Sequence, residues 1–158
     1  MSADDLEPLN ARLAVLMARL GEGERRVLGR RIGILIGRSN RKRIAAQQNP
    51  DGSPFEPRRP KDLGGKKGGI RRKAAGAMFR RLRTPKFLRT QSDADQVELG
   101  FAGAAARIAG VHHHGLRDRV SNRPGAPEAT YPQRRLLGLD EADREAILDE
   151  AFRHLESG

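Results

Sequence analysis

Three consecutive histidines, His112, His113 and His114, are the residues whose type first suggests metal chemistry. A zinc site needs three or four ligands that converge on one point, and neutral imidazoles serve well as ligands. Neighbouring residues of a helix point about 100° apart, so three adjacent histidines cannot all reach one ion. The fourth histidine, His154, is far away in the sequence. We therefore expect no metal site, and we expect these imidazoles to cap helix carbonyls or to contact a neighbouring chain.

Residues 64–69, Gly-Gly-Lys-Lys-Gly-Gly, look superficially like a phosphate-binding loop. A P-loop requires Gly-Lys followed by Ser or Thr after a hydrophobic strand, and this stretch has neither feature. No Gly-x-Ser-x-Gly nucleophile elbow occurs, and no Ser/His/Asp or paired-carboxylate arrangement stands out. We interpret the stretch as a basic loop, and we predict no catalytic residue, no cofactor and no enzymatic activity.

Positive charge is concentrated in the middle of the chain, whose formal net charge is +11. Residues 38–90 carry 17 Lys and Arg against three acidic residues, whereas residues 140–158 carry two against seven. A basic block suggests nucleic acid, because Lys and Arg release counterions from phosphates. It could equally face acidic protein surfaces in an assembly, or form a solvated loop. Its aromatic residues are scattered, and no zinc-finger, RNA-recognition or KH signature occurs, so nucleic-acid contact would be non-specific.

The composition favours one small domain, residues 1–158, that gains buried surface from neighbours. Of its 158 residues, 37% are hydrophobic and 4% aromatic, so the core must be thin. A thin core leaves little stability to spare, and partner subunits can supply further burial. The absence of cysteine excludes disulfides and thiolate metal sites. Apolar runs such as residues 32–36 are far too short to span a membrane, and the N-terminus lacks a basic leader, so we expect a cytoplasmic protein.

Two helices must position the first half of the basic block. Leucines at three- and four-residue spacing predict an amphipathic helix over residues 3–20, with Ser2 as its N-cap. A longer helix with a basic last part is predicted over residues 24–48. This helix carries glycines four residues apart on one face: Gly29, Gly33 and Gly37. Because glycine lacks a side chain, this face should let another helix or chain approach closely.

The middle of the chain is predicted to be irregular and then to form a hairpin. Dense turn residues end the long helix and open an extended arm over about residues 50–75. A short basic helix is predicted over residues 70–83. Two strands follow, over residues 87–91 and 96–101, because apolar and polar residues alternate there around the turn at residues 92–95.

The last third of the chain is predicted to add two helices and one strand. We expect a short helix over residues 103–113, a loop over residues 117–132 and a third strand over residues 134–139. Asp140 should cap a final amphipathic helix, with Asp143 at the capping-box position. The predicted fold is α+β: a small antiparallel sheet packed with several helices, including one long helix and an extended basic loop.

Four stretches of the chain form an ordered set of motifs. They are residues 41–58, which contain Gln-Gln-Asn-Pro-Asp-Gly before an aromatic residue and Pro-Arg; residues 78–88; residues 97–120; and residues 131–139, which lead into the acidic helix. Together they resemble the phage virion morphogenesis proteins, the tail completion proteins of contractile-tailed phages. The order is kept from about residue 4 to residue 155, although residues 64–69 are richer in Gly and Lys than the family pattern.

The resemblance implies a structural role late in tail assembly. Proteins of this family look like ring-forming proteins that terminate the tail tube or sheath at its head-proximal end and prepare it to join the head. The implied partners are the protein itself, tail tube and sheath proteins, and head–neck connector proteins, with no membrane. A sixfold ring would suit a contractile tail by analogy. The implied location is the virion, after assembly in the host cytoplasm.

Charge and resemblance together predict two complementary interaction surfaces. In a ring the same heterologous interface repeats, so a basic block can meet the acidic helix of the next subunit. The expected residues are Arg38, Arg41, Lys42, Arg43, Lys66, Lys67, Arg71, Arg72 and Lys73 on the basic side, and Glu145, Asp149 and Glu150 on the acidic side. We further expect residues 66–73 to line the lumen or to contact an acidic partner. The alternative is a nucleic-acid-binding module that uses residues 38–90.

Overall fold

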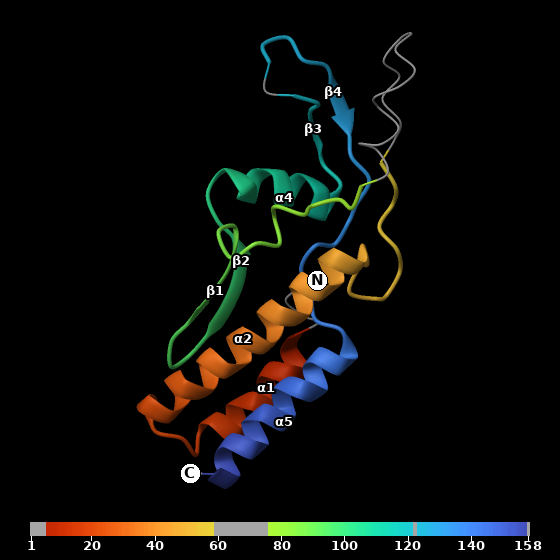
Figure 1. Ribbon diagram of the computed structural model, residues 1–158. Coiled ribbons are helices and arrows are strands. Elements are labelled where there is room, and N and C mark those ends of the chain that lie inside the picture. The colour runs from red at the N-terminus through yellow and green to blue at the C-terminus, as the bar shows by residue number, and fades with distance from the viewer. Residues whose placement is uncertain (1–5, 59–75, 122, 158) are drawn as a thin grey trace.

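Three helices pack side by side at one end of an elongated fold (Figure 1). The computed structural model describes residues 6–58, 76–121 and 123–157. The long helix α2 (Glu22–Ala46) packs against α5 (Glu141–Ser157), and α5 in turn packs against α1 (Glu7–Met17). Their shared apolar cluster consists of Leu9, Leu20, Leu28, Ile32, Ile36, Ile147 and Ala151. Both predicted N-terminal helices are confirmed, while the proposed Ser2 cap lies outside the described residues.

Local hydrogen bonds fix the ends of the long helix. At its start the Gly21 N–H donates to the Glu24 carboxylate over 2.8 Å. At its end Gln47 adopts a left-handed conformation, with φ of 61°, which stops the helix. The predicted turn then follows, closed by a hydrogen bond of 2.8 Å from the Asn49 N–H to the Ser53 carbonyl.

The glycine face of α2 is covered by a β-hairpin. Strand β1 (Leu88–Ser92) pairs antiparallel with β2 (Val97–Phe101), as predicted from the alternating pattern. A Cβ atom added at Gly33 would lie 2.7 Å from Cγ2 of Thr90, and one at Gly29 would lie 2.9 Å from the main-chain oxygen of Asp93. The glycines do permit a close approach, but the prediction of another helix or chain was wrong, because the hairpin of the same chain occupies this face.

A second apolar cluster lies beyond the hairpin, around α4 (Ala104–His114), which confirms the predicted short helix. It contains Ile44, Phe55, Met78, Leu82, Leu88, Ala105, Ala109 and Leu136.

Past α4, a small second sheet pairs β3 (Arg117–Arg119) with β4 (Glu128–Thr130), where a loop was predicted. Strands of three residues are too short to show a period-two pattern, which explains why the prediction missed them.

Two further predictions for this region were wrong. Of the helix predicted over residues 70–83, residues 70–75 lie outside the described residues, and residues 78–83 form turns in which Phe79 has a φ of 62°, a left-handed conformation that interrupts a helix. Residues 134–139 are extended but belong to no sheet. Burial alternates there, with Arg134, Leu136 and Gly138 inside, which imitates a strand. The hydrogen bonds of this segment go elsewhere: for example, the Gly138 N–H donates to Oδ1 of Asn40 over 3.0 Å.

The capping box of the final helix is confirmed. The Asp143 N–H donates to Oδ1 of Asp140 over 2.7 Å, and the Asp140 N–H donates to Oδ2 of Asp143 over 3.2 Å. The fold is therefore α+β, and in the described ranges two small two-stranded antiparallel sheets stand in place of the one predicted. None of the helices in the described ranges is long and apolar enough to cross a membrane.

Candidate interaction surfaces

The basic residues predicted near the end of α2 point in different directions. Arg38 and Lys42 are exposed, Arg41 is half-buried and Arg43 is buried. The two exposed residues extend a row of side chains spaced four residues apart along the helix, which we name the α2 ridge: Arg30, Ile34, Arg38 and Lys42. Ile34 is 56% exposed, so the ridge combines positive charge with an apolar side chain.

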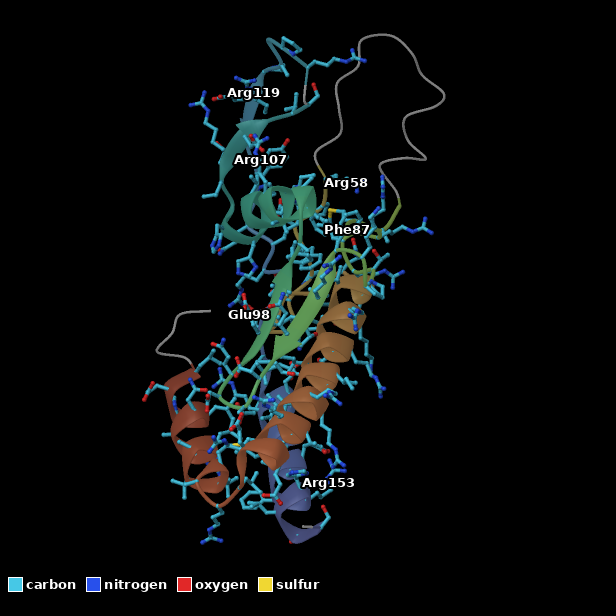
Figure 2. All side chains as sticks on the ribbon, turned by 90° about the vertical axis from the view of Figure 1, so that its left-hand side faces the viewer. Arg58, Phe87, Glu98, Arg107, Arg119 and Arg153 are labelled. Atoms are coloured by element: carbon cyan, nitrogen blue, oxygen red, sulfur yellow. The ribbon has the colours of Figure 1, made fainter. Side chains whose placement is uncertain are left out.

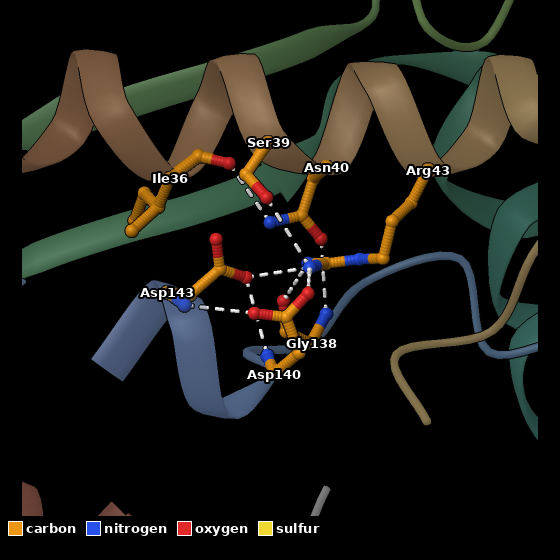
Figure 3. Close-up of polar contacts among 7 residues, drawn as sticks. All are labelled: Ile36, Ser39, Asn40, Arg43, Gly138, Asp140 and Asp143. Atoms are coloured by element: carbon orange, nitrogen blue, oxygen red, sulfur yellow. Dashed lines mark hydrogen bonds and ion pairs between the residues drawn. The ribbon is translucent and has the colours of Figure 1, made fainter. Parts of the chain in front are cut away.

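Arg43 holds the long helix to the start of the acidic helix (Figure 3). Its Nη1 lies 2.5 Å from Oδ2 of Asp143, 2.8 Å from Oδ2 of Asp140 and 3.2 Å from Oγ of Ser39. Its Nη2 donates to the Gly138 carbonyl. These bonds occupy the guanidinium inside the subunit. The structure therefore places Arg43 away from the interaction surface on which it was predicted.

Asn40 completes the same buried network. Its side chain is fully buried, its Nδ2 donates to the Ile36 carbonyl over 2.8 Å, and its Oδ1 accepts the Gly138 N–H. Sequence reasoning missed this residue. The available signal was an asparagine inside a helix, a position where its propensity is poor and where a specific hydrogen bond can compensate.

The acidic residues of α5 fall into two groups. Glu150 is used within the subunit, because its carboxylate lies 3.4 Å from Nη1 of Arg31 and 3.3 Å from Nη2 of Arg153. Glu145 and Asp149 are exposed, and neither forms an ion pair within the described part of the chain. They line an open groove of about 420 Å³ between α1 and α5, together with Phe152, which is 48% exposed. We name Glu145, Asp149 and Phe152 the α5 patch.

Helix α2 and the β1–β2 hairpin lie side by side (Figure 2). A basic groove lies between α2 and β1, and we name it the α2–β1 groove. Its volume is about 810 Å³. Its lining contains four arginines, Arg30, Arg38, Arg41 and Arg89, and no carboxylate. Sequence reasoning did not group these residues, because Arg89 is distant from the others in the chain and only the packing of the hairpin on α2 brings it near.

Two of the three histidines are half-buried, and His112 lies against the ring of Phe79 at the border of the second cluster. Nδ1 of His112 accepts a hydrogen bond of 3.2 Å from Nη1 of Arg134, and Nδ1 of His113 accepts the Leu137 N–H over 3.4 Å. Burial, reinforced by the charge of Arg134, lowers the pKa of His112 to about 4, and burial also lowers that of His113 to about 4. The imidazoles of His112 and His113 therefore bind residues 134–137 of their own chain, not the helix carbonyls that we predicted.

Metal chemistry finds no support in the described ranges, where no three metal-ligating side chains gather. The remaining predicted basic residues, Lys66, Lys67, Arg71, Arg72 and Lys73, lie outside the described residues.

The two chain segments that flank residues 59–75 are held at the same end of the fold. On one side Arg134 donates to the Glu56 carbonyl over 2.6 Å and to the Pro57 carbonyl over 3.1 Å. On the other side the Gln47 side chain bonds the Met78 N–H over 2.6 Å and the Met78 carbonyl over 3.0 Å. Both flanking segments therefore lie beside the second apolar cluster.

Comparison with known proteins identifies the same family that the ordered motifs resemble. The phage virion morphogenesis family matches the chain over residues 4–156. Tail completion protein S of Escherichia phage P2 is 34% identical over 146 residues, which cover 92% of this chain and 93% of that protein. No solved structure matches the chain. The family match spans nearly the whole sequence and confirms the resemblance: the chain belongs to the phage virion morphogenesis family.

Proposed function

We propose that this protein is a structural component that completes the phage tail. It closes the tail at the head-proximal end as a ring of identical subunits and takes part in joining the tail to the head. Family membership and the similarity to tail completion protein S support the tail completion role. The tail tube and sheath proteins and the head–neck connector proteins are its proposed partners, and a sixfold ring is proposed by analogy with the symmetry of contractile tails.

The observation that carries the ring proposal is a pair of unsatisfied surfaces of opposite charge. Arg38 and Lys42 on the α2 ridge are exposed and form no ion pair in the described ranges. Glu145 and Asp149 on the α5 patch are equally unpaired, and they line a different groove. Because the two surfaces lie at different places on a subunit, the α2 ridge of one subunit can meet the α5 patch of the next. A head-to-tail contact of this kind can close into a ring. Exposed Ile34 and Phe152 would add apolar burial to that contact.

The structure narrows the set of acidic residues that can serve between subunits. Glu150, predicted for this interface, already pairs with Arg31 and Arg153, and Asp140 and Asp143 hold Arg43. We therefore assign the contact to Glu145 and Asp149. For the basic residues at positions 66–73 we keep the proposal made from the sequence. We propose that they line the lumen of the ring or contact an acidic partner.

Charge reversal at the α5 patch tests the ring. Purified protein with Glu145→Lys and Asp149→Lys should lose rings in negative-stain electron microscopy and should fail to restore infectivity to phage that lack the wild-type protein, because both interface charges now repel the α2 ridge. Glu156→Lys is the matched control, since Glu156 is exposed on the same helix outside the α5 patch.

A compensating exchange sharpens the same test. Combining Glu145→Lys and Asp149→Lys with Arg38→Glu and Lys42→Glu should restore rings. The charges of both surfaces are then exchanged, so the two surfaces attract each other again. A wild-type protein that stays strictly monomeric and ignores purified tails would overturn the proposal. Rings that persist in the Glu145→Lys, Asp149→Lys protein would overturn the assigned interface.

A further inference from the structure

Strand β1 has one free hydrogen-bonding edge. At the two ends of the hairpin, the Ala102 N–H donates to the Phe87 carbonyl over 2.8 Å and the Asp93 N–H donates to the Gln96 carbonyl over 3.0 Å. Main-chain groups alternate in direction along an antiparallel strand, so Thr90 and Ser92 point theirs away from β2. Within the described ranges, neither residue uses its main-chain N–H or carbonyl in a hydrogen bond. This edge is open to another strand.

Residues of β1 form one wall of the α2–β1 groove, and residues of α2 form the other wall. The four arginines of the groove face no carboxylate in its lining. Arg41 connects the two walls, since its Nη2 donates to the Leu88 carbonyl over 3.2 Å, while its buried Nε has no partner in the described chain. The groove therefore combines free main-chain hydrogen-bonding groups with uncompensated positive charge, which fits an acidic occupant.

The shape and chemistry of the groove favour a protein segment over nucleic acid. An extended segment paired with β1 would place alternate side chains over α2, against Ile34 and the arginines on either side of it. Ile34 is 56% exposed and offers apolar contact that a phosphate backbone cannot use. The lining holds no aromatic residue on which a base could stack.

We propose that the α2–β1 groove binds an extended segment of a partner protein, in which acidic and apolar residues alternate, as a third strand on the edge of β1. Main-chain hydrogen bonds to Thr90 and Ser92 supply binding, and the arginines and Ile34 select the side chains. Three residues of the groove, Arg30, Ile34 and Arg38, also belong to the α2 ridge, so a bound segment and the α5 patch of a neighbouring subunit would compete for them. The α5 patch itself has no part in the groove, so variants of that patch leave the groove intact.

A direct test uses the full-length protein and a short synthetic peptide of alternating Glu and Val carrying a fluorescent label. The peptide should raise fluorescence anisotropy on binding, whereas the Lys-Val analogue should not. Amide hydrogen exchange read by NMR should slow at Thr90 and Ser92, which gain partners. The Gln91 amide, which already faces β2, should change little and serves as the internal control.

Two sets of variants separate strand addition from general charge attraction. Ser92→Pro removes an outward N–H without touching the β1–β2 ladder and should weaken peptide binding about tenfold, whereas Ser92→Ala keeps the N–H and should bind as wild type. Arg30→Glu with Arg89→Glu should also weaken binding about tenfold or more. Arg19→Glu, on an exposed residue outside the groove, is the charge control.

The proposal fails if Ser92→Pro and Ser92→Ala bind the peptide equally, or if exchange at Thr90 and Ser92 is unchanged by the peptide. It also fails if single-stranded DNA displaces the peptide and slows exchange at the same amides, which would make the groove a nucleic-acid site. The protein with Glu145→Lys and Asp149→Lys should bind the peptide normally, so failure of the ring and failure of the groove are distinguishable.

Discussion

At the scale of single residues, a connected set of polar side chains is buried between α2 and α5. Arg43, Asp140 and Asp143 form one connected network with Asn40 and Gly138. The network fixes where the segment before α5 crosses the long helix. A buried ion pair contributes little net stability when it is intact, but removing one partner leaves the other charge uncompensated. Its role here is therefore to define the packing of α5 on α2.

Replacing the central arginine tests this role. Arg43→Met should lower the free energy of unfolding by about 3–5 kcal/mol, because the Asp143 carboxylate loses its cation in a buried site. Urea denaturation followed by circular dichroism measures the change. Lys42→Met is the control, since Lys42 is exposed, and it should alter stability by no more than about 0.5 kcal/mol. An equal effect of the two substitutions would contradict the structural role of Arg43.

At the scale of elements, α2 is the component on which the others are assembled. One face of it carries α5, the glycine face carries the hairpin, and the α2 ridge remains exposed. The helices and the hairpin were predictable, because their apolar residues recur with the period of a helix or of a strand. The extended segment 134–139 was not, since its alternating burial is that of a strand although its hydrogen bonds go to side chains and loops.

The close packing of the hairpin on α2 predicts opposite effects for two glycines of the same helix. Gly29→Ala should destabilise the protein by about 1–3 kcal/mol, because the new Cβ meets a main-chain oxygen of the hairpin turn that cannot easily move. Gly23→Ala meets no atom within 4 Å and should be neutral or stabilise by up to about 1 kcal/mol. Thermal unfolding of both variants checks this. Stabilisation by Gly29→Ala would show that the hairpin does not lie against this face.

At the scale of the whole molecule, two apolar clusters are joined through α2 and the hairpin. Leu99 packs against both, so the helical end and the α4 end share one continuous interior. The charged side chains that we predicted to act between subunits fall into two groups. Arg43 and Glu150 already form ion pairs inside one subunit, and the exposed ones lie on the α2 ridge and the α5 patch.

The stability of the whole molecule should fall in mild acid. Burial lowers the pKa of His112 from 6.5 to about 4, so between these values the unfolded chain binds protons that the folded chain does not. The stability that neutral His112 contributes should therefore be fully present above about pH 6.5 and should be lost as the pH falls from there toward 4. His113 acts in the same direction.

Urea denaturation at several pH values measures this dependence. His112→Gln can still accept the hydrogen bond from Arg134 but does not titrate, so its stability should change less between pH 6.5 and 4. Gln133→Ala is the control, because Gln133 is exposed and does not titrate, so this variant should keep the wild-type dependence. An identical slope for wild type and His112→Gln would show that this imidazole does not control the acid sensitivity.

The sequence by itself determined the local elements and the family. Apolar periodicity defined the helices and the hairpin, turn residues defined their ends, and the ordered motifs identified a virion morphogenesis protein. Only the tertiary structure decided which charges are free. Residues 41–43 are neighbours in sequence, but successive side chains of a helix point about 100° apart. Arg41 therefore contacts β1, Lys42 faces solvent and Arg43 contacts α5. Whether a charged side chain is buried, paired or exposed depends on the element packed opposite it, and that partner lies far away in the chain.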